Sequence, residues 1–232
     1  MIGGIIQKKV AEDIYKRIAV SSEKANRKAK DITIVAVTKS FPVSAMISAY
    51  ESGFTVLGES RIQETEQKIE HYPYRKNTEL HLIGHLQSNK AKKAVKLYDI
   101  IETVDSLKLA KKIDLAAKNH KTTQRIFFQV NTGDDPAKFG ASRDEAIDVC
   151  LQISELKNIV LEGVMVIAPF TKYKKVLSKT FADTRKIRDN VISHGIKSCT
   201  SLSMGMSGDF EIAIEEGATH TRIGTALFGS RK

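Results

Sequence analysis

Tryptophan is absent from this sequence, and cysteine, proline and aromatic residues are scarce. The two cysteines, Cys150 and Cys199, lie far apart and outside any C-x-x-C pair, which argues against a zinc ribbon and a disulfide framework and predicts two reduced, packed thiols. No apolar run approaches the roughly 20 residues that span a bilayer. The apolar start of the chain, residues 1–6, is too short for a signal peptide. We therefore expect a cytoplasmic protein with no membrane segment.

Acidic residues are in the minority: 27 Asp and Glu stand against 37 Lys and Arg, for a formal net charge of +10. Such an excess suits nucleic acid, a membrane surface or small anionic ligands. The lysines are spread along the chain, however, and no basic run is interleaved with aromatic residues that could stack on bases. We interpret most of the charge as solvated helix faces and expect no nucleic-acid partner, with RNA binding kept as an alternative.

Apolar segments alternate regularly between a strand pattern and a helix pattern along the chain. The predicted strands cover residues 32–39, 54–57, 80–83, 100–103, 126–131, 160–167, 198–202 and 220–223, and the predicted helices cover residues 6–28, 43–52, 61–70, 88–96, 106–118, 142–154, 174–193 and 210–216. About eight β/α units predict an α/β fold with a single (β/α)8 barrel of TIM type over residues 1–232. An open doubly wound sheet is the alternative, and no linker or internal repeat divides the chain.

Lys39 ends the first predicted strand and is followed by Ser40, Phe41 and Pro42. The carboxyl end of a parallel strand faces the mouth of an α/β fold, where ligands usually bind. Partial burial at that place lowers the pKa of an amine and favours its reaction with an aldehyde cofactor. Most lysines at strand ends are solvated, so Lys39 alone does not establish a site.

Two turns near the C-terminus are rich in glycine and hydroxyl-bearing residues. The first covers residues 201–209 and leads into a predicted helix, and the second covers residues 221–226 after the last strand. A small-residue turn between a strand and a helix presents backbone N–H groups and the positive end of the helix dipole to an anion. Ser203, Ser207 and Thr225 can add hydroxyl donors. The last two such turns of a β/α barrel frequently form a phosphate site.

Motifs for other chemistries are missing. Glu59 stands where a Walker loop needs Lys, and Asp209 stands where a nucleophile elbow needs Gly. His81 and His85 are four residues apart, but a strand end and Gly84 separate them, which argues against a shared metal ion. No metal site is predicted.

Several segments, taken in order, closely resemble one known family. They are Val35-Ala36-Val37-Thr38-Lys39, residues 58–64 (GESRIQE), residues 80–90 (LHLIGHLQSNK), Val130-Asn131 with Lys138 and Gly140, residues 201–209 (SLSMGMSGD), and Thr221-Arg222-Ile223-Gly224. This is the pyridoxal phosphate homeostasis protein family. The resemblance covers almost the whole chain, and the combination of S-M-G-M-S, R-I-G and I-G-x-L-Q-x-N-K is highly specific.

The resemblance implies a fold similar to the N-terminal domain of bacterial alanine racemase. It implies that Lys39 forms a Schiff base with pyridoxal 5′-phosphate (PLP) and that Arg222 faces the pyridine nitrogen. A cation there keeps this nitrogen unprotonated and makes the ring a weaker electron sink. The residues implied in phosphate binding are Ser203, Met204, Gly205, Ser207, Gly224 and Thr225. Ser60 and His81 are further candidates, although many relatives carry Asn where this chain has Ser60, which has a shorter reach.

The implied function is to hold PLP and to take part in intracellular vitamin B6 homeostasis, without strong catalytic activity. The expected partners are PLP and PLP-dependent apoenzymes, and we expect a monomer. A PLP-dependent amino-acid racemase is the first alternative. That fold normally needs a second, β-rich domain to supply an opposing base, and this chain ends eight residues after Gly224. A basic RNA-binding protein is the second alternative, supported by net charge alone.

Overall fold

The computed structural model describes residues 4–230, so residues 1–3 of the opening segment, in which no signal peptide is expected, lie outside the described residues. Among residues 4–230, no helix combines the length and the apolar character needed to cross a bilayer. The strands are β1 (Thr33–Val37), β2 (Val56–Glu59), β3 (Glu79–Leu82), β4 (Ile100–Val104), β5 (Gln124–Val130), β6 (Ile159–Val166), β7 (Ser201–Met206) and β8 (His220–Ile223). The α-helices are α1 (Lys8–Lys24), α2 (Val43–Glu51), α3 (Ile62–Ile69), α4 (Ala91–Leu97), α5 (Leu107–Asn119), α6 (Arg143–Ser154), α7 (Lys174–Ser193), α8 (Phe210–Glu215) and α9 (Thr225–Phe228), and the short 3-10 helices are η1 (Ala29–Asp31), η2 (Arg75–Asn77) and η3 (Ser88–Lys90).

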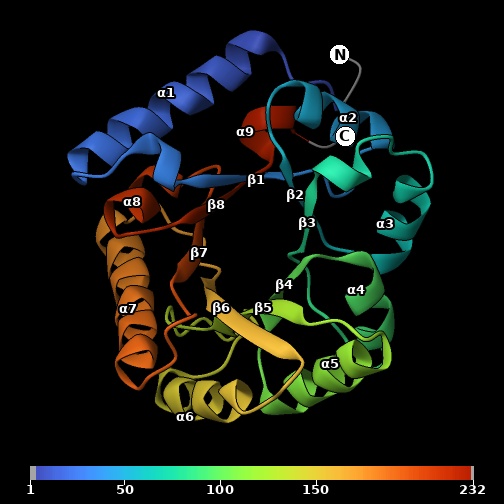
Figure 1. Cartoon of the computed structure of the whole chain (residues 1–232). Coiled ribbons are helices and arrows are strands. Elements are labelled where there is room, and N and C mark those ends of the chain that lie inside the picture. The colour runs from blue at the N-terminus through green and yellow to red at the C-terminus, as the bar shows by residue number, and fades with distance from the viewer. Residues whose placement is uncertain (1–3, 231–232) are drawn as a thin grey trace.

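The strands form one closed barrel in chain order, and every neighbouring pair is parallel. Closure is made by β1, in which Val35 is in register with Val56 of β2 on one side and with Arg222 of β8 on the other. Figure 1 looks into this ring and shows the helices around its outside. The predicted (β/α)8 barrel is therefore confirmed, and the open sheet is excluded.

The helices pack an apolar stripe against the outer face of the barrel. In α5, the side chain of Ser106 accepts a hydrogen bond from the N–H of Leu109 and so caps the helix. Leu109, Ile113 and Ala116 recur at helical spacing and are all buried. Most of the buried apolar residues belong to this layer between strands and helices. A smaller apolar cluster of Ile100, Phe127 and Met165 fills part of the barrel interior.

The seventh strand differs from the prediction. A strand was expected over residues 198–202 with a turn after it, but β7 runs from Ser201 to Met206, so the turn begins only at Ser207. Leu202 and Met204 are buried in the outer core, and alternation along a strand points Ser203 to the other side, into the barrel. The small residues of β7, which are also typical of turns, fit a crowded barrel interior.

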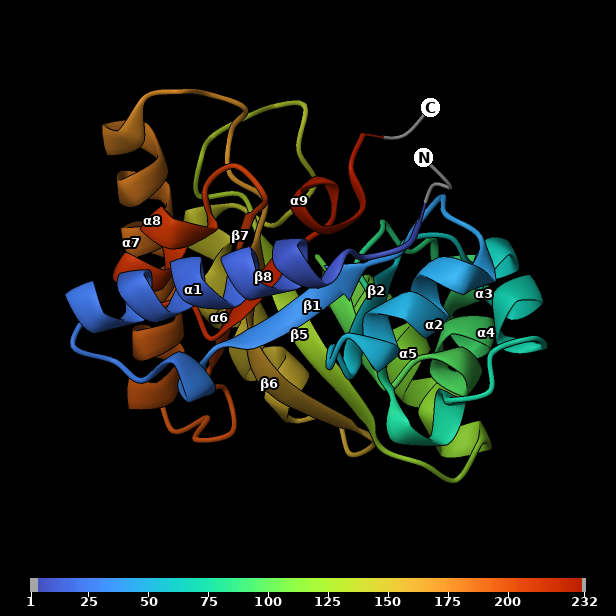
Figure 2. The ribbon, with the colours of Figure 1, turned by 90° about the horizontal axis from the view of Figure 1, so that it is seen from above.

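The other predicted elements agree with the structure more closely. β2 begins two residues later than expected and extends through Glu59, and the first helix ends at Lys24 instead of reaching residue 28. In Figure 2 the carboxyl end of β8 leads up to α9, and the loops after β5 and β6 rise on the same side of the barrel. This rim is called the mouth below.

We predict that Gly205→Ala lowers the free energy of unfolding by about 2–4 kcal/mol. Gly205 has a φ of +88°, and a Cβ there would lie 2.5 Å from the Cβ of Ala213 and 2.9 Å from the Cα of Phe210. Urea unfolding measures the loss. The control is Gly208→Ala, because a Cβ on Gly208 meets nothing within 4 Å. Equal stabilities of the two variants would contradict this account of β7.

Candidate functional site

Lys39 lies in a tight turn at the mouth, directly after β1. The turn continues through Ser40, which has a φ of +63°, to Pro42 at the start of α2. Lys39 is half-buried. The end of β8 lies beside it, since a Cβ on Gly224 would come 3.3 Å from the Cβ of Val37. The structure thus brings Lys39 to the same rim as the second C-terminal turn, as the sequence predicts.

A buried ion pair between β2 and α3 holds the Lys39 turn. The Lys68 Nζ donates to Glu59 Oε1 at 2.8 Å and to the carbonyl of Thr38 at 3.0 Å. The hydroxyl of Thr38 donates to the same Glu59 oxygen at 2.6 Å. Glu59 is 0% exposed and the Lys68 side chain 7%. The residue before Lys39 is therefore fixed through both its backbone and its side chain.

Glu64 completes this support. One of its oxygens, Oε1, accepts the Ser40 N–H at 2.6 Å and lies 2.6 Å from Lys68 Nζ. Burial alone would raise the pKa of Glu64, but hydrogen bonds from Lys68 and Ser40 outweigh it and lower that pKa. For Glu59 burial prevails over Lys68, and its pKa is raised. In the sequence, residues 58–64 indicate only the family resemblance. The (i, i+4) spacing of Glu64 and Lys68 is the signal that could have indicated an ion pair.

The two C-terminal turns converge on one oxygen atom. The Ser207 Oγ accepts the backbone N–H groups of Gly224 and Ala226, each at 3.2 Å. Close by along the chain, Asp209 Oδ1 accepts the N–H of Met206 at 2.6 Å. A cavity of about 180 Å³ opens beside this turn, with Met206, Gly208 and Asp209 in its lining. Backbone donors aimed at an oxygen next to an open cavity are what an oxyanion needs.

Arg222 lies buried beneath these turns, inside the barrel. Its Nη1 donates to Ser203 Oγ at 2.6 Å and its Nη2 to the carbonyl of Val166 at 2.7 Å. The hydroxyl of Ser203 in turn donates to Glu102 Oε2 at 2.5 Å. Burial lowers the pKa of Arg222, and Glu102 opposes the shift. A guanidinium remains charged under such conditions because its ordinary pKa is so high.

The remaining predicted phosphate residues have different surroundings. Met204 points into the outer core, Gly205 meets α8, and Thr225 begins α9 with its side chain exposed. The structure therefore brings together Arg222, Ser203, Ser207 and Gly224, whereas Met204 contributes to packing.

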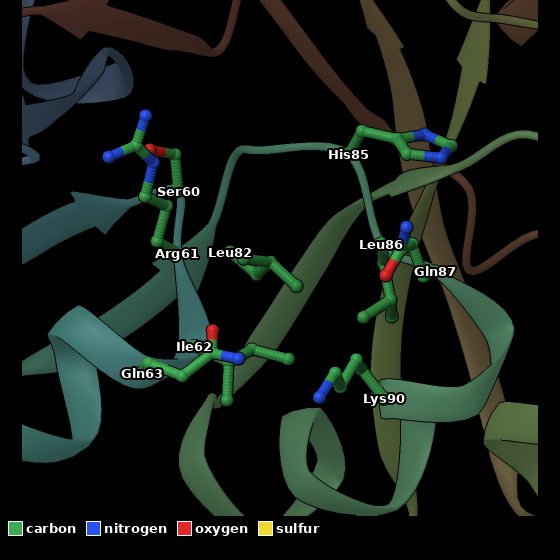
Figure 3. A pocket seen from close by; sticks show the side chains of 9 residues that line it. All are labelled: Ser60, Arg61, Ile62, Gln63, Leu82, His85, Leu86, Gln87 and Lys90. Atoms are coloured by element: carbon green, nitrogen blue, oxygen red, sulfur yellow. The ribbon is translucent and has the colours of Figure 1, made fainter.

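Ser60 lies at the end of β2 and lines a separate small pocket at the mouth, shown in Figure 3. This pocket has a volume of about 150 Å³ and is bounded also by Arg61, His85 and Lys90. A Cβ on Gly84 would lie 2.3 Å from the Ser60 carbonyl oxygen, so the ends of β2 and β3 approach very closely here.

His81 is fully buried in the barrel interior, whereas His85 is exposed at the mouth. The two rings do not form a pair of metal ligands. The ring of His81 contacts Glu102 and Glu79, whereas His85 stacks on Phe139 with ring centroids 4.0 Å apart. Across residues 4–230, no cluster of three or more His, Cys, Asp or Glu side chains could hold a metal ion.

The barrel and its site define a protein of the alanine racemase N-terminal type, and the family model "Alanine racemase, N-terminal domain" matches residues 14–232. Alanine racemase from Clostridium difficile shares this fold at 18% identity with a TM-score of 0.72, over 93% of this chain and 57% of that one. A protein from Bifidobacterium adolescentis is 34% identical, with a TM-score of 0.91 over 95% of this chain and 94% of that one.

The pyridoxal phosphate homeostasis protein of Vibrio alginolyticus is 34% identical over 95% of each chain. PipY of Synechococcus elongatus, solved with PLP bound, is 33% identical with a TM-score of 0.81, over 93% of this chain and all of that one. The chain belongs to the pyridoxal phosphate homeostasis protein family. Its curated relatives are named as homeostasis proteins rather than as enzymes.

We predict that Lys68→Met lowers the free energy of unfolding by about 3–5 kcal/mol, because it leaves the buried Glu59 carboxylate without its cation. Lys93→Met is the matched control: its ion pair with Glu66 is 3.0 Å long but exposed on both sides, so the loss is at most about 1 kcal/mol. Urea unfolding compares the two. Equal losses would show that the Lys68 ion pair has no special role.

Two neighbouring histidines, the buried His81 and the half-buried His220, should give the protein a stability maximum at about pH 6.5. Burial would lower the pKa of His81, but hydrogen bonds to Glu102 and Glu79 raise it to about 9. Burial lowers the pKa of His220 to about 4. Above pH 6.5 the folded state alone keeps the His81 proton, and stability falls as pH rises toward 9. Below pH 6.5 the unfolded state alone binds a proton at His220, and stability falls as pH drops toward 4.

Each histidine contributes a slope of up to about 1.4 kcal/mol per pH unit. Urea unfolding at a series of pH values measures both slopes, and His220→Gln should remove the acidic one. A free energy of unfolding that stays constant from about pH 6.5 to about pH 9 would contradict the assignment for His81.

Proposed function

We propose that this protein binds PLP through Lys39 as a Schiff base and takes part in intracellular PLP homeostasis without strong catalysis of its own. The observation that carries the proposal is the convergence of the Gly224 and Ala226 N–H groups on the Ser207 oxygen, at the rim where Lys39 also lies. A lysine and an oxyanion site at one rim are the two attachment points that an aldehyde phosphate requires.

The residues present fit the cofactor at both ends. A phosphate oxygen can take the place of the Ser207 oxygen on the two N–H groups, with the hydroxyl of Ser207 turned to donate instead. Arg222 lies beneath these turns as a buried cation and provides a donor for a ring nitrogen. The aldehyde of PLP condenses with a primary amine, and this is the chemistry that the cofactor supplies when bound.

The surroundings of Lys39 position its amine. The turn is fixed on one side by Glu59 and Lys68 through Thr38 and on the other by Glu64 through Ser40. A side chain on a fixed backbone loses less freedom when it engages a ligand. The protein thereby holds the amine at the mouth. The cup formed by Ser207, Gly224 and Ala226 orients the phosphate.

The cation at Arg222 argues for holding the cofactor rather than for racemisation. A guanidinium does not release its proton, so a ring nitrogen that faces it stays unprotonated and the ring is a weak electron sink. The homeostasis names of the curated relatives support the same choice. We extend the proposal to a cytoplasmic monomer that supplies PLP to apoenzymes.

The test is the visible spectrum of the purified protein after addition of PLP, followed by borohydride reduction and peptide mapping. We expect an absorption band of a protein-bound Schiff base and a pyridoxyl group on the Lys39 peptide. Lys39→Met should abolish the band. Lys90→Met, in the pocket beside Ser60, should leave it unchanged.

Pyridoxyl groups scattered over surface lysines, or a band that survives Lys39→Met, would overturn the proposal. An amino-acid racemisation assay on the PLP-loaded protein separates a carrier from an enzyme: rapid racemisation would favour the racemase alternative. Tight RNA binding with a steep salt dependence would favour the second alternative.

A further inference from the structure

A row of polar side chains with alternating charge runs through the barrel from Arg222 near the mouth to the opposite end. In order of contact its members are Arg222 (β8), Ser203 (β7), Glu102 (β4), His81 and Glu79 (both β3), Arg125 (β5) and Glu162 (β6). His81 lies beside the interior apolar cluster of Ile100, Phe127 and Met165, with its ring centroid 6.4 Å from that of Phe127.

The contacts of His81 fix its protonation state by geometry. Its Nδ1 lies 2.6 Å from Glu102 Oε1, and its Nε2 lies 2.9 Å from Glu79 Oε1. An ionised carboxylate can only accept a hydrogen bond, so both ring nitrogens must donate and the ring is an imidazolium. The pKa of Glu79 is lowered to about 2, above all by His81, and Arg125 adds to the effect, which keeps that carboxylate ionised.

The same argument orders the hydrogen bonds between Glu102 and Arg222. A guanidinium can only donate, so the Ser203 oxygen accepts from Arg222 and its hydroxyl hydrogen is committed to Glu102. Glu102 Oε2 stays 3.8 Å from Arg222 Nη1, with Ser203 between them. The other oxygen of Glu102 is occupied by His81.

The cation at His81 decides how strongly Glu102 attracts Arg222. With His81 charged, Glu102 has a cation on each side, and Arg222 rests on Ser203 and on the Val166 carbonyl. With His81 neutral or absent, the charge of Glu102 would draw the Arg222 guanidinium toward itself, because an unpaired charge is very costly in a buried position.

We propose that His81 is a positioning residue of the cofactor site: as an imidazolium it holds Glu102, and through Glu102 and Ser203 it sets the position of the Arg222 guanidinium. This inference rests on the proposed function for what Arg222 contacts. Replacing a buried ion pair by apolar groups is often neutral or stabilising, so stability alone does not account for the row. The titratable groups that face His81 are Glu79, Glu102 and the ring of His220, whose centroid lies 6.0 Å away. The apolar ring of Phe127 also packs against it.

The first test needs no mutation. Nitrogen NMR of the full chain, labelled at histidine, should find both ring nitrogens of His81 protonated from about pH 6 to about pH 8. Saturation with PLP should shift the His81 signals and leave those of His194, exposed at the end of α7, in place. A neutral His81 ring at about pH 7, or no response of His81 to PLP, would overturn the inference.

The second test compares two histidines of the same interior. His81→Gln should weaken PLP binding about tenfold, or about 1.4 kcal/mol, and should change the absorption and fluorescence of the bound cofactor. His220→Gln should change the affinity less than about twofold, because its ring makes no hydrogen bond to Glu102. If His81→Gln does not fold, the response of the wild-type His81 signals to PLP in the NMR experiment decides the inference.

The outcomes separate the two proposals. A wild-type protein that does not bind PLP contradicts the proposed function, whereas unchanged affinity and spectrum in His81→Gln, with normal wild-type binding, contradict only the role of His81.

Discussion

The pairing of β1 with β8 is the contact on which the candidate site depends. It closes the barrel and brings the strand that ends before Lys39 beside the strand that carries Arg222. All the strands are parallel, so their carboxyl ends meet at one mouth. An amine from the first β/α unit and the turns of the last two units therefore share one rim, although most of the chain separates them in sequence. A sheet with the same strand order that did not close would have left β1 and β8 as distant edges.

The sequence was sufficient to predict the fold, because the fold depends on local patterns. Apolar runs, helix caps and strand-end positions are short-range signals, and they predicted the barrel and placed Lys39 at the carboxyl end of its first strand. The same signals misplaced β7. Serine and glycine are typical of turns, but in Ser201–Met206 their small size suits a strand whose inner face lies against buried charges. Composition therefore predicted a turn where the structure has a strand.

The supports of the site were not predictable, because they join residues that no local pattern connects. Ser203 and Glu102 are 101 positions apart and touch only after the barrel closes. The spacing of four residues between His81 and His85 suggests only a metal pair, which the intervening strand end argues against. The real partners of His81, Glu79 and Glu102, lie on its own strand and on the adjacent one. A single sequence reveals strand ends but not which interior side chains meet.

The double hydrogen bond to Ser207 has a consequence for how a ligand enters and leaves. In the absence of an anion, the Gly224 and Ala226 N–H groups already have an acceptor in the Ser207 oxygen. The cup therefore keeps its shape without its ligand and exposes no unsatisfied donors. At the proposed site, an arriving phosphate would have to replace the Ser207 oxygen as the acceptor of these two N–H groups. Such an exchange would lower the affinity compared with open donors, and it would favour reversible binding.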